Sequence, residues 1–161
     1  MLNVGILTIS DKGSQGQRDD KSGQEIKNSL APLNGHFARY EIIPDELDVI
    51  QQKLMEWADN GNVDIIITTG GTGLSQRDVT PEATLSVADK TVPGLAEAMR
   101  AGTLDKTPRA MLSRATAGVR RKCLIVNLPG SPKAVGECLA VILPVLPHAV
   151  EIIKGVITDH S

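Results

Sequence analysis

Residues 68–84 read TTGGTGLSQRDVTPEAT and combine glycines, hydroxyl side chains and an Arg–Asp pair directly after an apolar run. Gly70, Gly71 and Gly73 allow backbone N–H groups to approach an anion closely. Thr80, which is followed by proline, is predicted to be the N-cap of a helix, and the partial positive charge of a helix N-terminus favours the same anion. The stretch therefore predicts a loop that binds phosphate groups.

The two common phosphate loops do not fit this stretch. No Gly-Lys-Ser/Thr triplet follows Gly70, which excludes a P-loop, and Gln76 stands where a dinucleotide fingerprint has its third glycine. A tight strand-to-helix turn is the alternative, but such a turn explains only one or two glycines. We therefore predict a phosphate-binding loop of another kind.

Asp78 lies in the same stretch, although a carboxylate beside bound phosphates repels them. A Mg²⁺ ion between the two removes this conflict, because magnesium takes hard oxygen ligands and bridges them to phosphate. Asp45 and Asp11 follow other predicted strands and are candidates for the same task. The alternative for Asp45 is that it is only an acid at the start of the helix predicted after it.

The elements that must position these residues alternate between strands and helices along the chain. Apolar runs at 2–9, 36–43, 63–69 and 122–130 predict strands, and apolar residues spaced by three and four between them predict helices. This alternation predicts the α/β class. The expected architecture is a three-layer α/β/α sandwich with a mainly parallel sheet, in a single domain over residues 1–161.

In such a sheet, ligands bind beyond the carboxyl ends of the strands. Each of the four ends carries an acid, a glycine turn or a hydroxyl, and together they cover residues 8–11, 44–46, 70–78 and 127–131. Turns favour these residue types in any case, but four such endings at one edge of a sheet predict a binding site.

The helices carry three local expectations. Leu85 and Ala88 are expected to form the apolar face of the short helix that begins near Thr80. A further helix is expected near 94–101, and the last helix is expected to kink at Pro144.

Composition excludes several function classes. The 161 residues are 41% apolar and only 2% aromatic, which argues against a platform that stacks single-stranded nucleic acid. The net charge of −2 leaves no overall basic field for nucleic acid or a membrane surface.

The charge is unevenly distributed along the chain. Eight Lys/Arg against three Asp/Glu fall within 89–122, either as a solvated surface or as a patch that attracts an anionic small molecule. The apolar stretch at 139–150 is too short to span a bilayer and the N-terminus lacks a signal-peptide pattern, so a soluble cytoplasmic protein is expected.

Side chains of other common catalytic schemes are sparse. His36, His148 and His160 are scattered, so neither a metal cluster nor a Ser-His-Asp triad is expected. Cys123 and Cys138 lie in apolar segments without CxxC spacing, and we expect them to be buried free thiols in a reducing compartment.

Taken together, six segments of the chain resemble molybdopterin adenylyltransferases of the MogA/MoaB type, a family that also includes the gephyrin G domain. The segments are ISDKG with a following D-SG (9–23), IPDE (43–46), TTGGTG with RDVTPEAT (68–84), VPGLAEAMR (92–100), LSRATAGVR (112–120) and NLPGSPKAV with a following CL (127–139). They cover nearly the whole chain, and their order and spacing make the resemblance specific.

The resemblance implies a homotrimer of three-layer domains and a Mg²⁺-dependent reaction. AMP passes from ATP to the terminal phosphate of molybdopterin, pyrophosphate is released, and the product goes on to a molybdate-insertion protein. Asp45 and Asp78 match the two acids implied to be catalytic and to hold the metal. The residues implied to bind nucleotide or pterin are Ser10, Asp11, Gly70, Gly71, Thr72, Gly73, Glu97, Arg100, Pro129, Gly130 and Ser131.

The chemistry of this reaction agrees with the residue types. Nucleotidyl transfer depends on positioning and on neutralising charge, so a missing His or Cys nucleophile is no obstacle. Arginines of the basic stretch 89–122 are expected to stabilise the spread negative charge. A non-catalytic molybdopterin carrier or scaffold is the alternative, and the presence of both acids opposes it. Molybdate insertion is a third interpretation, which normally requires further domains.

Overall fold

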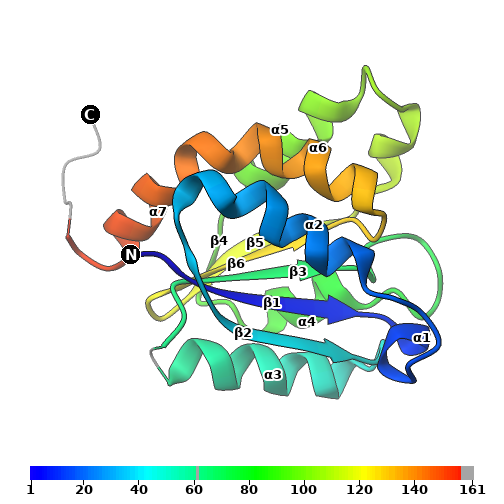
Figure 1. Ribbon diagram of the computed structural model, residues 1–161, viewed down its shortest axis with the longest axis horizontal. Helices are drawn as coiled ribbons and strands as arrows, with labels where there is room; N and C mark the ends of the chain where they lie inside the picture. Colours follow the sequence, from blue (N-terminus) through cyan, green and yellow to red (C-terminus); the bar gives the residue numbers. More distant parts are fainter. Residues whose placement is uncertain (61, 157–161) are drawn as a thin grey trace.

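A six-stranded sheet covered by helices on both faces forms the protein in the computed structural model, which describes residues 1–60 and 62–156 (Figure 1). The strands are β1 (Asn3–Ile9), β2 (His36–Ile43), β3 (Ile65–Thr69), β4 (Lys90–Thr91), β5 (Ala117–Arg120) and β6 (Cys123–Leu128). They lie in the order β2-β1-β3-β6-β5-β4. β1, β2, β3 and β6 are mutually parallel, and β5 is antiparallel to both of its neighbours.

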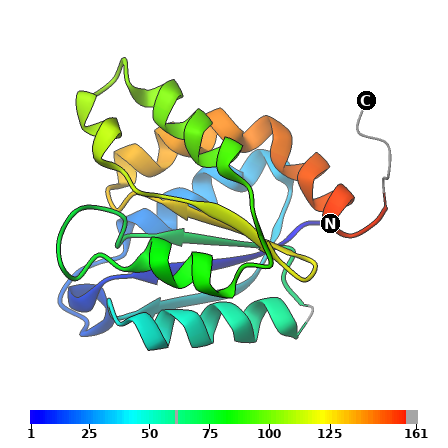
Figure 2. The same ribbon diagram turned by 180° about the vertical axis from the view of Figure 1, so that it is seen from behind.

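The helices cover the sheet in two layers. They are α1 (Asp11–Ser14), α2 (Lys21–Leu30), α3 (Leu47–Asp59), α4 (Thr80–Val87), α5 (Pro93–Thr103), α6 (Pro132–Ile142) and α7 (Leu146–Ile153), with short 3₁₀ turns η1 (Ala31–Leu33), η2 (Pro108–Leu112) and η3 (Leu143–Val145). Figure 1 and Figure 2 show α2, α5, α6 and α7 on one face and α3 and α4 on the other. The predicted three-layer sandwich with a mainly parallel sheet is confirmed.

The central strand β3 is apolar on both faces because helices cover both. Ile65 and Ile67 pack into the core cluster beneath α2, α5 and α6, whereas Ile66 packs into the cluster over α3 and α4. All three side chains are fully buried. Burying a side chain of this size contributes about 1.5–3 kcal/mol each, so the sheet is fixed in place from both sides.

A buried polar group joins the ends of β3 and β6 to α4. The Asn127 side-chain amide donates to Thr68 Oγ1 at 3.1 Å and to Thr84 Oγ1 at 2.9 Å, and its Oδ1 accepts the backbone N–H of Thr116 at 3.3 Å. Asn127, Thr68 and Thr84 are fully buried. This network holds the end of β3, from which the glycine stretch begins, in a fixed relation to α4.

Two local expectations about α4 are wrong. Thr80 is the first helical residue rather than the N-cap, which is Val79, and the Thr80 hydroxyl instead donates to the carbonyl oxygen of Gly70 at 2.9 Å. Leu85 is 47% exposed, and the helix packs through Ala83 and Val87 instead. The position of the sheet decides which face of so short a helix is buried, and the sequence spacing alone does not reveal it.

The expectation for 90–121 is incomplete. The helix expected near 94–101 is present as α5, but the sequence pattern does not predict the strands β4 and β5. β4 has two residues and β5 reads AGVR, so neither carries a strand signal of its own. β5 exists because it pairs with β6, which is a tertiary effect.

The C-terminal helices together form a long apolar run. The run Pro132–Ile153 has 22 residues and a mean hydropathy of 1.7, which is enough by length and composition to cross a membrane, and 28% of that window is buried. The expectation that this region is too short to span a membrane is therefore wrong, because the whole run is long enough. Val135, Leu139 and Leu146 are fully buried against the sheet, which accounts for part of the apolarity. The kink expected at Pro144 is present as the 3₁₀ turn η3.

Both cysteines are free and buried, as predicted. Burial raises the pKa of the Cys123 thiol to about 12 and that of Cys138 to about 11. Thiols of this kind are unreactive at neutral pH. His160 lies outside the described residues. So does Gly61, where the pair Asn60–Gly61 predicts the end of the helix that follows Asp45.

Replacing Asn127 with alanine is expected to lower the free energy of unfolding by about 2–4 kcal/mol, because two hydroxyls and one N–H lose buried partners. Urea denaturation measures the change. Asn28→Ala is the matched control, since within the described residues the Asn28 side chain makes only an exposed hydrogen bond with Gln24, and its effect should stay within about 0.5 kcal/mol. Equal losses in the two variants would show that the buried network contributes nothing.

Candidate functional site

A cleft of about 720 Å³ lies at the carboxyl ends of the parallel strands. β2 and β3 lie on opposite sides of β1, so the strand order reverses next to β1. Ligands of open α/β sheets bind in the crevice at such a switch point. Among the predicted residues, the cleft brings together Ser10, Asp45, Gly70, Gly71, Asp78, Gly130 and Ser131. The rule on strand ends therefore leads to a real cavity.

A second cavity of about 430 Å³ adjoins the first, between α5, η2 and the start of α6. The predicted residues that line it are Thr72, Gly73, Arg100, Pro129 and Ser131. Ser131 lines both cavities, so the two meet at the N-terminus of α6. Glu97 is exposed on α5 and lines neither cavity.

The glycine stretch makes a turn that only glycine can adopt at two positions. Gly70 has φ 99° and Gly71 has φ 71°, both in the left-handed region. A Cβ on Gly70 would overlap the carbonyl oxygen of Ile9, and a Cβ on Gly71 would overlap the Thr80 hydroxyl. The tight-turn alternative thus explains these two glycines.

Gly73 serves a different purpose. A Cβ there would lie only 2.9 Å from Asp78 Oδ2, so the glycine lets the carboxylate rest against the loop backbone. Asp78 Oδ2 also accepts the Ser75 N–H at 3.0 Å. The third glycine is therefore required by the position of the acid.

The two predicted catalytic acids flank the glycine turn. Asp45 Oδ2 accepts the backbone N–H of Asp11 at 2.9 Å, and Asp45 Oδ1 lies on the side of Gly71, where an added Cβ would be 3.3 Å away. Asp78 lies on the side of Gly73. Both acids line the cleft, so their carboxylates face the same space.

Negative charge accumulates at this point. Burial raises the pKa of Asp45 above its usual value, and the neighbouring charges of Asp11 and Asp78 act in the same direction. By contrast, hydrogen bonds from Arg77 are the main reason that the pKa of Asp11 lies below its usual value. A cation between Asp45 and Asp78 would relieve their repulsion.

The donor set suits Mg²⁺ only together with substrate phosphates. Within residues 1–60 and 62–156, no three His, Cys, Asp or Glu side chains are grouped so that they could hold a metal ion. Magnesium is usually held by one or two carboxylates plus substrate phosphates and water. Asp45 and Asp78 fit that pattern.

The arginines of the basic stretch divide into two groups: Arg100 and Arg109 line the second cavity, whereas Arg114 and Arg120 line neither cavity. Arg114 donates to the carbonyl oxygens of Gly73 and Asp78, both at 2.8 Å, and pairs with Glu82. It therefore supports the loop that carries Asp78, a role that sequence reasoning missed. Arg120 pairs with Asp59 at the opposite end of the sheet.

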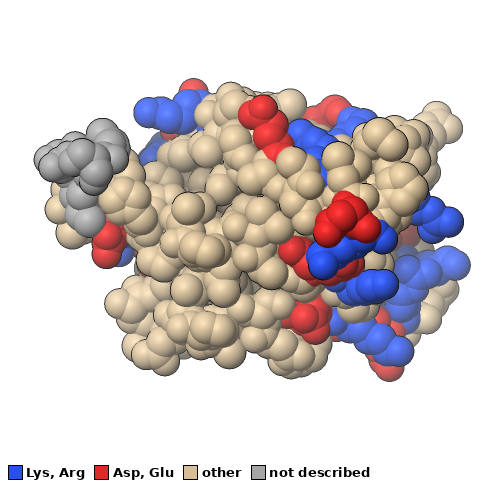
Figure 3. Space-filling model, turned by 90° about the horizontal axis from the view of Figure 1, so that it is seen from above, with Lys and Arg blue, Asp and Glu red and all other residues tan. Residues whose placement is uncertain are grey.

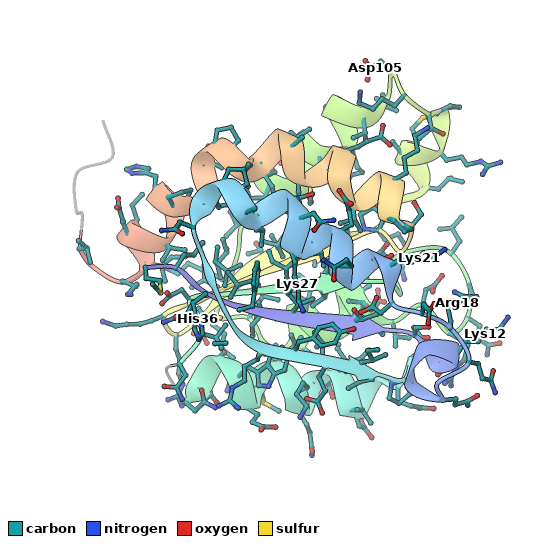
Figure 4. All side chains as sticks on the ribbon, viewed as in Figure 1. Lys12, Arg18, Lys21, Lys27, His36 and Asp105 are labelled. Carbon is teal, nitrogen blue, oxygen red and sulfur yellow. The ribbon has the colours of Figure 1, made fainter. Side chains whose placement is uncertain are left out.

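The cations at the cleft come from the loop before α2 and from the first residue of α2. Arg18 and Lys21 line it, and Figure 4 shows them together with Lys12 at the end of the molecule where β1 finishes. None of these three side chains takes part in the ion pairs found within the described part of the chain. Figure 3 shows charged side chains crowded at the same end.

A carboxylate fixes this loop. Asp20 accepts the Thr8 hydroxyl at 2.7 Å and the Gly23 N–H at 2.9 Å, and the Tyr40 hydroxyl donates to it as well. Asp20 is thereby the N-cap of α2. Ser22 Oγ also donates to the Gly130 carbonyl at 2.6 Å, which ties the loop to the other side of the cleft.

Comparison with known proteins agrees with this geometry. Residues 5–148 match the family model described as "Probable molybdopterin binding domain". The chain belongs to this family. The resemblance inferred from the six sequence segments is confirmed.

Members of the molybdopterin-binding family are similar over almost the full chain. A molybdopterin adenylyltransferase of Helicobacter pylori J99 is 44% identical over 156 residues, which cover 96% of this chain and 89% of that protein. The crystal structure of the molybdopterin biosynthesis enzyme MoaB from Thermus thermophilus superposes with a TM-score of 0.91 at 53% identity, covering 96% and 98% of the two chains. Gephyrin of Dictyostelium discoideum is 45% identical over 94% of this chain, which spans only 22% of gephyrin.

Gly70→Ala is expected to lower the free energy of unfolding by at least about 2 kcal/mol, because the left-handed backbone and the overlap with Ile9 both oppose a Cβ. Gly94→Ala is the control, since no atom of the described residues lies within 4 Å of a Cβ there and alanine is favoured in a helix. Thermal and urea unfolding measure both. A Gly70→Ala protein as stable as the parent would contradict the turn described above.

Proposed function

We propose that this protein transfers AMP from ATP to the terminal phosphate of molybdopterin, with release of pyrophosphate, in molybdenum cofactor biosynthesis. The observation that carries the proposal is the pair Asp45 and Asp78, which flank the glycine turn in the cleft. The 44% identity to a molybdopterin adenylyltransferase over 96% of the chain supports it. On this proposal the whole of residues 1–161 acts as one molybdopterin-binding domain.

The two cavities suit two substrates that must meet. The first cleft has acids at its floor and Arg18 and Lys21 at its side, which suits the phosphates of a nucleotide with a divalent cation. The second is lined by Arg100, Lys106, Arg109 and Lys133 and suits the other anionic substrate. Because Ser131 belongs to both, the reacting phosphates would come together near the N-terminus of α6.

The chain's own residues bind and orient the substrates. Gly70 and Gly71 have no side chains, so phosphates can approach the backbone of the turn. Asp45 and Asp78 would hold Mg²⁺, which when bound supplies positive charge at the α-phosphate and holds the leaving pyrophosphate. The attacking group is a phosphate that is already ionised, so no side chain need act as a general base.

A molybdopterin carrier or scaffold without catalysis is the second candidate. It rests on the family resemblance, since this chain is also similar to a region that makes up 22% of the longer protein gephyrin. The two acids oppose it, because a carrier has no need of paired carboxylates that repel bound phosphates. ATP as co-substrate, the homotrimer, delivery to a molybdate-insertion protein and a cytoplasmic location complete our proposal and rest on the family resemblance.

Asp78→Asn is expected to lower turnover by at least about 100-fold while molybdopterin affinity is largely kept, because a metal ligand is lost and little else changes. Pyrophosphate release from Mg·ATP and molybdopterin measures turnover, and fluorescence titration measures pterin binding. Asp48→Asn is the matched control, an exposed acid in the first turn of α3. Normal turnover by Asp78→Asn would disprove the metal role. Tight pterin binding without pyrophosphate release by the wild type would favour the carrier.

Replacing both Arg18 and Lys21 with glutamine is expected to raise the KM for ATP about tenfold with a smaller effect on kcat, because two charge-assisted contacts to phosphate are lost. Steady-state kinetics at fixed ionic strength measure both constants. Lys12→Gln is the control, since Lys12 lies in the nearby helix α1 and is not among the residues that line the cleft. An equal effect of Lys12→Gln would mean that only overall charge matters.

A further inference from the structure

Arg77 joins three loops at the edge of the cleft. Its Nε donates to Asp11 Oδ2 at 3.1 Å, and its Nη2 donates to Asp11 Oδ1 at 3.0 Å and to Glu46 Oε1 at 2.9 Å. Arg77 lies between β3 and α4, Asp11 begins α1 two residues after the end of β1, and Glu46 follows β2. One guanidinium therefore connects the loops after three neighbouring parallel strands.

Asp11 in turn forms two hydrogen bonds with Asp45. The backbone N–H of Asp45 donates to Asp11 Oδ1 at 2.9 Å, and the backbone N–H of Asp11 donates to Asp45 Oδ2 at 2.9 Å. Asp11 Oδ1 thus accepts from both Arg77 and Asp45. The reciprocal pair fixes one oxygen of Asp45 and leaves the other on the side of Gly71.

We propose that Arg77 is a positioning residue, which holds Asp45 in place through Asp11 and so sets how tightly Asp45 and Asp78 bind a divalent cation with its nucleotide. The proposal rests on the function proposed above for the identity of the nucleotide reaction. Its structural part, the connection Arg77–Asp11–Asp45, rests on the contacts alone.

The geometry of the contact requires arginine. The planar guanidinium bonds both oxygens of Asp11 and reaches Glu46 at the same time, whereas the single ammonium of lysine cannot reproduce this fork. Without Arg77, Asp11 and Asp45 would repel each other with no cation between the loops. Asp45 would then leave its place beside the glycine turn.

The connection contributes little to the stability of the fold. The side chains of Arg77, Asp11 and Glu46 are 53%, 37% and 53% exposed, and exposed ion pairs stabilise proteins only weakly. Loss of Arg77 should therefore change the binding of the cation and leave unfolding almost unchanged. This difference separates a positioning role from a merely structural one.

The test uses Mn²⁺ as the probe, with a non-hydrolysable ATP analogue, and measures bound Mn²⁺ by electron paramagnetic resonance. Arg77→Ala is expected to weaken Mn²⁺ binding about tenfold and Arg77→Lys by less, with urea unfolding midpoints close to that of the parent. Arg120→Ala is the matched control, because it removes an equally bidentate pair with Asp59 far from the cleft. Its Mn²⁺ affinity should equal that of the parent.

A double-mutant cycle tests the route through Asp11. If Arg77 acts through that carboxylate, Arg77→Ala added to Asp11→Asn should have almost no further effect on Mn²⁺ binding. A full effect of Arg77→Ala in the Asp11→Asn background, or wild-type Mn²⁺ affinity in Arg77→Ala, would overturn the inference.

The two proposals fail in different ways. A wild-type protein that binds Mn²⁺ and nucleotide but forms no adenylylated pterin disproves the proposed function, and the cycle still decides the role of Arg77. A wild-type protein that does not bind Mn²⁺ with the nucleotide overturns both.

Discussion

Repulsion among like charges constrains the end of the sheet at which the parallel strands finish. Asp11, Asp45 and Asp78 follow three neighbouring strands and come together there, and Asp45 is partly withdrawn from water. Arg77 neutralises Asp11, and the backbone N–H of Asp11 donates to the Asp45 carboxylate. What is left is a concentration of negative charge beside a glycine turn, open to a cleft with cationic side chains along its side. A nucleotide with its divalent cation is complementary to that arrangement.

Charges can be held this close only on a rigid support. The buried isoleucines of β3 fix the strand between two helical layers, and Asn127 fixes its end against α4. Arg114 then holds the loop through the carbonyls of Gly73 and Asp78. The exposed contacts made by Arg77 are weak by comparison. The stability of the site and the position of its Asp45 carboxylate therefore depend on different parts of the molecule.

The sequence predicts the fold and the place of the cleft well, because both follow from local patterns. Apolar runs give the parallel strands, and the rule on strand ends places Ser10, Asp45, Gly70 and Ser131 in one cleft. The partners of the arginines cannot be predicted in this way, since Arg114 meets Glu82 and Arg77 meets Asp11 only after folding. For the same reason the sequence does not reveal β5, which depends on pairing with β6, or the role of the Thr80 hydroxyl.

Arg77 and Asp78 are neighbours in sequence, yet one side chain reaches outward to Asp11 while the other lines the cleft. Their assignment depends on the number of residues between the glycine turn and α4. One inserted or deleted residue in that span would shift both side chains relative to the turn, and the contact of Arg77 with Asp11 and the place of Asp78 in the cleft could not both be kept without a rearrangement of the loop. Leu74, in the same span, is 68% exposed and meets no such requirement. The length of this span is therefore a stronger constraint on the site than the side chain at position 74.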